Sequence, residues 1–342
     1  MLLKVFGKNP SGNELEKIKA SANYRDESFN NLAPTSMMEN TSMLSVLWKF
    51  INKPKNTIPP TPLPSVKTNL KSLPDDAPVI IWFGHSSYLI KINGKHILVD
   101  PVFSGHASPF SFTTKSFAGT DVYTVDDFTE IDILIISHDH YDHLDYETIK
   151  KITPTTKIIC TSLGVAAHFD YWGLNKNKIV EFDWWDCHEV LNGIQLTAVP
   201  ARHFSGRTFV RNKTLWSAFV LQTNQYSIFI GADSGYGDHF KLIQQKFGSF
   251  DLAILECGQY NLAWHSIHMM PEETVQACID LHAKVLMPVH WGKFSLSLHA
   301  WDEPIKRVVA KADESGVKIT TPMIGEPVLL NNVYPKKDWW LL

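Results

Sequence analysis

Short apolar runs separated by turn residues fill positions 78–290, and this pattern is typical of β-strands. The expected strands in the amino-terminal half are 79–83, 88–92, 96–99, 131–136 and 157–160, with helices at 146–152 and 163–171. The dipeptide Asn93-Gly94 predicts a hairpin between the second and third of these strands.

The carboxyl-terminal half repeats this order of elements. Its expected strands are 194–199, 215–221, 226–230, 250–256 and 284–288, with a helix at 271–281 that begins at Pro271. A hairpin, a buried strand, a helix and a further strand therefore occur twice. The sequence predicts an α+β fold of two similar halves, packed sheet to sheet with helices outside. Chance similarity of short apolar strands is the alternative.

Residues 1–75 differ from the remainder of the chain. Five prolines between positions 54 and 64 predict an extended, semi-rigid arm, and a catalytic domain would then occupy 76–342. Residues 42–51 form one short amphipathic helix in this arm. Docking of that helix on the main domain is the favoured interpretation, and a contact with a membrane surface or a partner is the other.

Composition narrows the class of protein. Of 342 residues, 44% are hydrophobic and 20% charged, as in soluble globular proteins, and a net charge of −3 argues against nucleic-acid binding. The four cysteines lie far apart, which favours reduced thiols, and neither a signal peptide nor a membrane span is evident. We therefore expect a cytoplasmic protein, with a peripheral membrane contact or an oligomer left open.

The segment 137–145 contains the most informative chemistry. His138, His140, Asp142 and His143 follow the apolar strand 131–136 within six residues. Imidazoles and carboxylates crowded at the end of a strand are hard to accommodate unless a cation gathers them. The sequence therefore predicts a metal site in this loop.

Three further residues of the ligand type follow other strands. His203 comes after 194–199, Asp233 after the second hairpin, and His290 after the last strand. Seven candidates suffice for two ions with a shared carboxylate. Imidazole and carboxylate without thiolate suit zinc, and manganese or iron less well.

The loop resembles the H-x-H-x-D-H signature of the metallo-β-lactamase superfamily. Other segments are similar to the N-acyl-phosphatidylethanolamine phospholipase D family. These are Trp82-Phe83-Gly84-His85, Asp100-Pro101-Val102-Phe103-Ser104, Ala107-Ser108-Pro109, Asp183-Trp184-Trp185, Leu215-Trp216, Gly231-Ala232-Asp233-Ser234-Gly235-Tyr236, Pro271-Glu272-Glu273 and His290-Trp291-Gly292-Lys293-Phe294. The loop 257–261 and the arm depart from the family pattern.

The resemblance implies a four-layer αβ/βα sandwich and a two-zinc site. His138, His140 and His203 would hold one zinc ion, and Asp142, His143 and His290 the other, with Asp233 bridging them. His268, just before the helix at 271–281, would lie beside the metals.

The implied reaction is hydrolysis of a phosphodiester, in the manner of a phospholipase D acting on N-acyl-phosphatidylethanolamine. Two cations lower the pKa of a bridging water, Asp142 orients it, and His268 protonates the leaving oxygen. We expect His85 to orient a ligand, Arg207 to attract an anionic substrate, and the departing loop with Tyr260 to shape the pocket.

Two alternatives remain, and the second of them belongs to another class of protein. The first is a hydrolase of a small phosphorylated or cyclic metabolite, such as a sugar-phosphate lactone, and a largely polar cleft without an apolar groove at 37–51 or 103–120 would favour it. A non-enzymatic metal-binding sensor would have lost ligands, whereas all seven positions are filled here.

Overall fold

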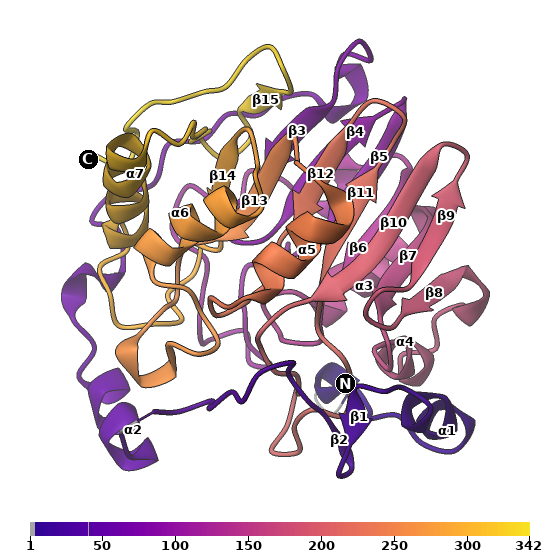
Figure 1. Ribbon diagram of the computed structural model, residues 1–342. Coiled ribbons are helices and arrows are strands. Elements are labelled where there is room, and N and C mark those ends of the chain that lie inside the picture. Colours follow the sequence, from indigo (N-terminus) through magenta and orange to yellow (C-terminus); the bar gives the residue numbers. More distant parts are fainter. Residues whose placement is uncertain (1–3, 40) are drawn as a thin grey trace.

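The structure is a computed structural model that describes residues 4–39 and 41–342. Two large β-sheets stand face to face in it, with helices on the outer sides (Figure 1). The main hydrophobic core lies between the sheets and continues through the second sheet to the helices on its outer side, and a second core lies between the first sheet and the helices that cover it. The order of layers is therefore helices, sheet, sheet, helices.

The first sheet has seven strands in the order β15-β3-β4-β5-β6-β7-β8. Its strands are β3 (Val79–Trp82), β4 (Tyr88–Ile92), β5 (Lys95–Val99), β6 (Ile131–Ile136), β7 (Thr156–Ser162), β8 (Ile179–Phe182) and β15 (Pro327–Leu329). Alternate residues of β3 face the two cores, because Ile80 packs between the sheets and Ile81 packs under the helices. Both faces of this sheet are therefore covered.

The second sheet has six strands in the order β14-β13-β12-β11-β10-β9. They are β9 (Cys187–Leu191), β10 (Ile194–Pro200), β11 (Ser217–Gln222), β12 (Ser227–Ile230), β13 (Leu252–Glu256) and β14 (Leu286–Val289). In each half an antiparallel hairpin leads into parallel strands: β4–β5 into β6 and β7, and β11–β12 into β13 and β14. The predicted duplication of the fold is confirmed.

Seven α-helices lie within the described residues. They are α1 (Asn13–Lys19), α2 (Met43–Ile51), α3 (Tyr146–Ile152), α4 (Ala166–Tyr171), α5 (His239–Phe247), α6 (Pro271–Asp280) and α7 (Glu303–Ser315). Buried residues of α3 and α4 contribute to the core under the first sheet, and those of α5, α6 and α7 belong to the main core. The four-layer αβ/βα sandwich is thus complete.

The expected strands and helices match well, with corrections at some ends. The helix expected from 163 begins only at Ala166, after a turn. Helices α5 and α7 and the edge strands β8, β9 and β15 were not expected. Edge strands are short and partly exposed, so they lack the dense apolar runs of the central strands.

The amino-terminal segment wraps across the ends of the sheets, with α1 and α2 at its two sides (Figure 1). It contains α1 and a small hairpin of β1 (Tyr24–Arg25) and β2 (Ser28–Phe29), neither of which the sequence predicted. Ile18 and Phe29 are buried in the main core. The division at residue 75 into arm and domain stays a prediction, but the segment is packed against the sandwich.

Among residues 4–39 and 41–342, none of the helices combines the length and hydropathy that a membrane crossing requires.

Trp339 connects the carboxyl-terminal end of the chain to the seam between the sheets. Its ring lies 5.0 Å from that of Trp291 and 6.3 Å from that of Trp82. We expect Trp339→Ala to lower the free energy of unfolding by about 3 kcal/mol because it opens a cavity there. Urea denaturation followed by fluorescence measures this. Leu341→Ala, at a 63% exposed position, is the control, and an equal effect of both substitutions would contradict the packing role.

Candidate metal centre

All seven predicted ligands lie at strand ends on one edge of the sandwich. Those of the loop 137–145 follow β6, His203 follows β10, Asp233 follows β12, and His290 follows β14. The first strand belongs to one sheet and the other three to the second sheet. The site is therefore built by both halves of the fold, where loops are held rigidly by the strands before them.

The first group of side chains consists of His138, His140, His203 and Asp233. The Nε2 atoms of His138 and His203 lie 2.9 Å and 3.2 Å from His140 Nδ1. Asp233 Oδ2 lies 3.9 Å from His138 Nε2 and 3.8 Å from His203 Nε2. Three imidazole nitrogens and one carboxylate oxygen thus converge on one point.

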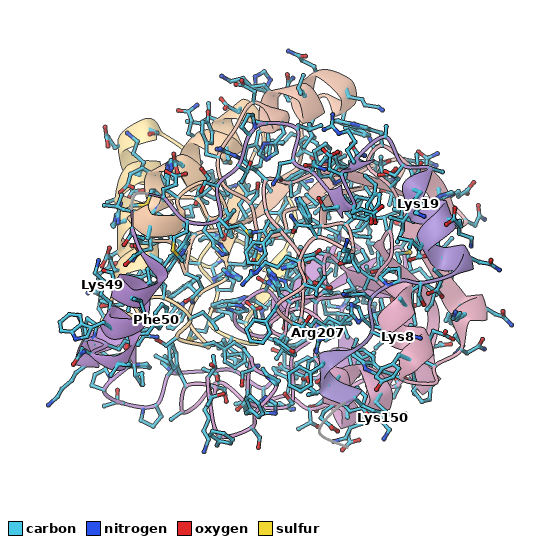
Figure 2. The ribbon with its side chains drawn as sticks, turned by 90° about the horizontal axis from the view of Figure 1, so that it is seen from below. Lys8, Lys19, Lys49, Phe50, Lys150 and Arg207 are labelled. Carbon is cyan, nitrogen blue, oxygen red and sulfur yellow. The ribbon has the colours of Figure 1, made fainter. Side chains whose placement is uncertain are left out.

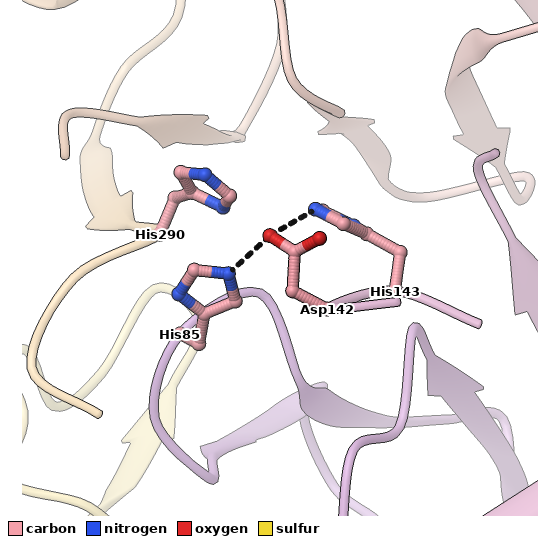
Figure 3. Close-up of side chains that lie close together, drawn as sticks. All are labelled: His85, Asp142, His143 and His290. Carbon is pink, nitrogen blue, oxygen red and sulfur yellow. Dashed lines mark hydrogen bonds and ion pairs between the residues drawn. The ribbon is translucent and has the colours of Figure 1, made fainter. Parts of the chain in front are cut away.

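The second group consists of His85, Asp142, His143 and His290, which Figure 3 shows turned toward one another. Asp142 Oδ2 lies 2.9 Å from His85 Nε2 and 3.6 Å from His143 Nε2. Asp233 reaches this group too, since its Oδ2 lies 3.1 Å from His143 Nε2 and its Oδ1 lies 3.1 Å from His290 Nδ1. Asp233 therefore stands between the two groups.

Hydrogen bonds on the outer sides of the imidazoles fix their orientation. His143 Nδ1 lies 2.8 Å from Asp100 Oδ2, and His203 Nδ1 lies 2.9 Å from the Ile267 carbonyl oxygen. Partners of this kind orient ligating histidines in metalloproteins. Asp100 was not singled out as a functional residue, although an aspartate that ends a buried strand was a signal for it.

Burial and charge set the protonation of the groups. Burial among other imidazoles lowers the pKa of His138, His203 and His290 well below the usual range, so these rings are neutral. Burial opposes a charge on His143, but Asp233, Asp142 and Asp100 outweigh it and raise its pKa well above the usual range. The negative charge of these carboxylates therefore stabilises a positive charge beside His143.

These residues fit divalent metal ions. Asp233 Oδ1 is buried and, although it lies 3.1 Å from His290 Nδ1, accepts no well-oriented hydrogen bond among the described residues, as expected of an oxygen that faces a metal ion. Ligand nitrogens of a tetrahedral zinc ion, at Zn–N distances of about 2.0–2.1 Å, lie roughly 3.3 Å apart. The imidazole nitrogens of the first group are already near that spacing.

His268 lies beside both groups. Its ring centre is 5.0 Å from that of His203 and 5.4 Å from that of His290. Its Nδ1 atom lies 2.6 Å from Oε2 of Glu256, a buried carboxylate at the end of β13 that the sequence analysis did not select. An acid that ends an otherwise apolar strand, at the position matching Ser137 in the first half, was the available signal.

The structure places Arg207 and Tyr260 away from these groups. Arg207 is buried, and its guanidinium donates to the carbonyl oxygens of Val5, Asp139 and Leu144. Tyr260 donates to Glu303 at 2.6 Å. The expectation for Arg207 is therefore wrong, because Arg207 holds the histidine loop in place. The Tyr260 hydroxyl faces α7, but Gln259 of the same loop lines the cavity at these groups.

A cavity of about 610 Å³ opens onto the two groups. His140, Asp142, His203, Asp233, His268 and His290 form its polar end. The remaining wall is mostly apolar and includes Met37, Met38, Phe50, Phe204, Trp264, Ile267 and Leu296. Arg211 also lines it, with its guanidinium 4.7 Å from the centre of the Phe204 ring.

Comparison with known proteins agrees with this fold and site. Residues 95–291 match the family model of the beta-lactamase superfamily domain. The solved structure of a metallo hydrolase from Ignicoccus hospitalis has the same fold, with a TM-score of 0.57 at 17% sequence identity over 74% of this chain and 97% of that chain. The fold and the side-chain groups together define a metal-dependent hydrolase.

Relatives in sequence are closer. An uncharacterized protein of Mycobacterium tuberculosis is 36% identical over 94% of this chain and 88% of its own length. The N-acyl-phosphatidylethanolamine-hydrolyzing phospholipase D 1 of Caenorhabditis elegans is 31% identical over 72% of this chain and 74% of its own length. The chain belongs to the metallo-β-lactamase superfamily and, within it, to the N-acyl-phosphatidylethanolamine phospholipase D-like family.

The position of Asp233 between the groups predicts the metal content of variants. We expect Asp233→Ala to lose most of the bound metal, because it removes the carboxylate that faces both groups. Elemental analysis of protein purified without chelators measures this. His188→Ala, on the exposed part of β9, should keep the wild-type content, and full metal content in Asp233→Ala would contradict the shared role.

Proposed function

We propose that the chain is a zinc-dependent phosphodiesterase of the phospholipase D type that hydrolyses N-acyl-phosphatidylethanolamine-like phospholipids. The observation that carries this proposal is the apolar wall of the cavity at the metal centre. Seven apolar side chains can pack against an acyl chain, whereas a small polar metabolite would gain no binding energy from an apolar wall. Three of them, Met37, Met38 and Phe50, come from the segment 37–51.

The proposed zinc ligands are those expected from the sequence. His138, His140 and His203 would hold one ion and Asp142, His143 and His290 the other, with Asp233 shared. His85 joins the second group, and its role beside Asp142 stays a prediction. Two bound zinc ions supply a water of lowered pKa and Lewis acidity toward a phosphate oxygen.

The side chains around the cavity support the remaining steps. Asp142 would orient the attacking water, and His268 would give a proton to the leaving alcohol oxygen. Glu256, Asp233 and Asp142 outweigh burial and raise the pKa of His268 to about 9, which keeps it protonated at neutral pH. Arg211 is the cation placed to attract a phosphate, since Arg202 and Arg207 bind protein atoms.

The outer face of α2 supports a peripheral membrane contact. Phe50 turns inward and stacks on Trp264, with ring centres 6.2 Å apart, whereas Leu44, Trp48 and Ile51 are 78%, 65% and 75% exposed. Figure 2 shows Lys49 and Phe50 of this helix at the edge of the molecule. A helix with exposed apolar residues and a lysine beside the cavity suits a phospholipid surface.

Substrate chains should be recognised at Phe50. We expect Phe50→Ser to lower kcat/KM for a long-chain N-acyl phospholipid about 10-fold, because the contact of this half-buried ring with an acyl chain is worth about 1.4 kcal/mol. Hydrolysis of the water-soluble bis(p-nitrophenyl) phosphate should change less than about twofold. Wild-type zinc protein that hydrolyses neither compound would refute the proposed function, and equal losses would refute the role of the wall.

Membrane binding is tested separately on α2. We expect Trp48→Asp to weaken binding to phospholipid vesicles about 10-fold, since one large apolar side chain no longer enters the interface. Vesicle co-sedimentation measures this. Leu242→Asp, at a 46% exposed position on α5, is the matched control. If both variants bind as the wild type does, α2 is not the contact.

A further inference from the structure

Glu256 is a buried carboxylate with three hydrogen-bond partners in two different loops. Its Oε1 atom accepts from the backbone N–H of Ser234 at 2.9 Å and of Met269 at 3.1 Å. Its Oε2 atom lies 2.6 Å from His268 Nδ1. Only 1% of the residue is exposed. A buried carboxylate in this setting is costly unless all its lone pairs find partners, and here both oxygens do.

The two loops that Glu256 joins both contribute to the metal centre. Ser234 directly follows Asp233, and Met269 directly follows His268. The loops touch, because a Cβ atom at Gly235 would overlap the Ser266 carbonyl oxygen. Between β13 and α6, the only regular element in the described chain is a single 3₁₀ turn at Leu262–Trp264. His268 therefore depends on side-chain contacts for its position.

The bond to Glu256 decides which way the His268 ring faces. With Nδ1 committed to the carboxylate, Nε2 is left for the other side of the ring. That ring lies against His203 and stacks on His290, with 18° between the planes of the last pair, and it lines the cavity. A carboxylate that holds the far nitrogen of a catalytic histidine fixes both its tautomer and its direction.

We propose that Glu256 is a positioning residue that holds the His268 imidazole with Nε2 toward the leaving oxygen of the phosphodiester. This inference rests on the proposed function. In the step concerned, the attacking water forms a new P–O bond while the bond from phosphorus to the alcohol oxygen breaks. The alcohol oxygen takes the proton from His268 Nε2. The imidazole is then neutral and still donates its Nδ1–H hydrogen bond to Glu256. The proton that the attacking water releases reprotonates Nε2.

Leaving-group chemistry separates this role from a structural one. An alkoxide leaves poorly without a proton, whereas p-nitrophenolate leaves without one. We expect Glu256→Gln to slow the cleavage of an N-acylethanolamine phosphodiester about 10²-fold, the low end of the range for general acid catalysis. Cleavage of the matching p-nitrophenyl ester should fall less than about threefold. The variant Glu256→Gln/His268→Ala should be no slower than His268→Ala alone, because the two residues act as one unit.

Two controls accompany the kinetic comparison. Glu181→Gln replaces another carboxylate that accepts backbone N–H groups, those of Gly164 and Ala166, outside the cavity. It should cleave both esters as the wild type does. Metal content is measured in every variant, because ligand-type atoms of Glu256, Asp233, His268 and His290 lie within 4.8 Å of one another and could themselves hold an ion. Should Glu256→Gln fail to fold, Glu256→Asp keeps the charge and should slow only the alcohol ester.

The outcomes of these measurements separate a positioning role from a metal-ligand role and from failure of the proposed function. Equal slowing of both esters by Glu256→Gln would overturn the positioning role. Loss of bound metal from Glu256→Gln would also overturn it, because Glu256 would then be a metal ligand. Wild-type protein that cleaves neither ester would overturn the proposed function itself. Selective slowing of the alcohol ester with full metal content is the result that the geometry predicts.

Discussion

The structure depends on the convergence of buried imidazoles and carboxylates at the edge where the two sheets meet. His138, His203 and His290 are neutral there, whereas Asp142 and Asp233 are held ionised. Asp233 faces both groups, so the negative charge is concentrated between them. Buried charge of this kind is tolerated only with compensating partners. Divalent cations would compensate this charge, and the surrounding hydrogen bonds hold the groups in position for them.

The backbone conformation around the site also helps to hold these groups together. His85 and His290 both have positive φ angles, of 54° and 66°, which are costly for residues other than glycine. The loops that carry them are joined by two hydrogen bonds, from His85 N to Trp291 O at 3.0 Å and from His290 N to His85 O at 2.9 Å. One of these loops comes from each half of the fold. The duplicated halves are thus fastened together at the site itself, and the aromatic cluster of Trp82, Trp291 and Trp339 lies directly beside it.

The central elements of this arrangement were predictable because local sequence determines them. Asn93-Gly94 forms the hairpin turn between β4 and β5, and the apolar run at 131–136 is β6, since a turn dipeptide and a buried strand need no distant partner to be recognised. Helix α7 was missed although Gly316, in the left-handed region, ends it as a helix-terminating glycine does. The contacts of Arg207 and Glu256 were not predictable, because their partners lie in other loops and only the folded chain brings them together. The contact of Tyr260 was not predictable either, because its position in a divergent loop does not indicate a hydrogen bond to Glu303.

We infer that two cations bind between the halves of the fold and share Asp233. Anomalous diffraction at the zinc edge from crystals of zinc-loaded protein tests it most directly. We expect two anomalous peaks about 3.5–4 Å apart, one against His138, His140 and His203 and the other against Asp142, His143 and His290, with Asp233 in contact with both. A single peak, or peaks that Asp233 does not contact, would contradict it.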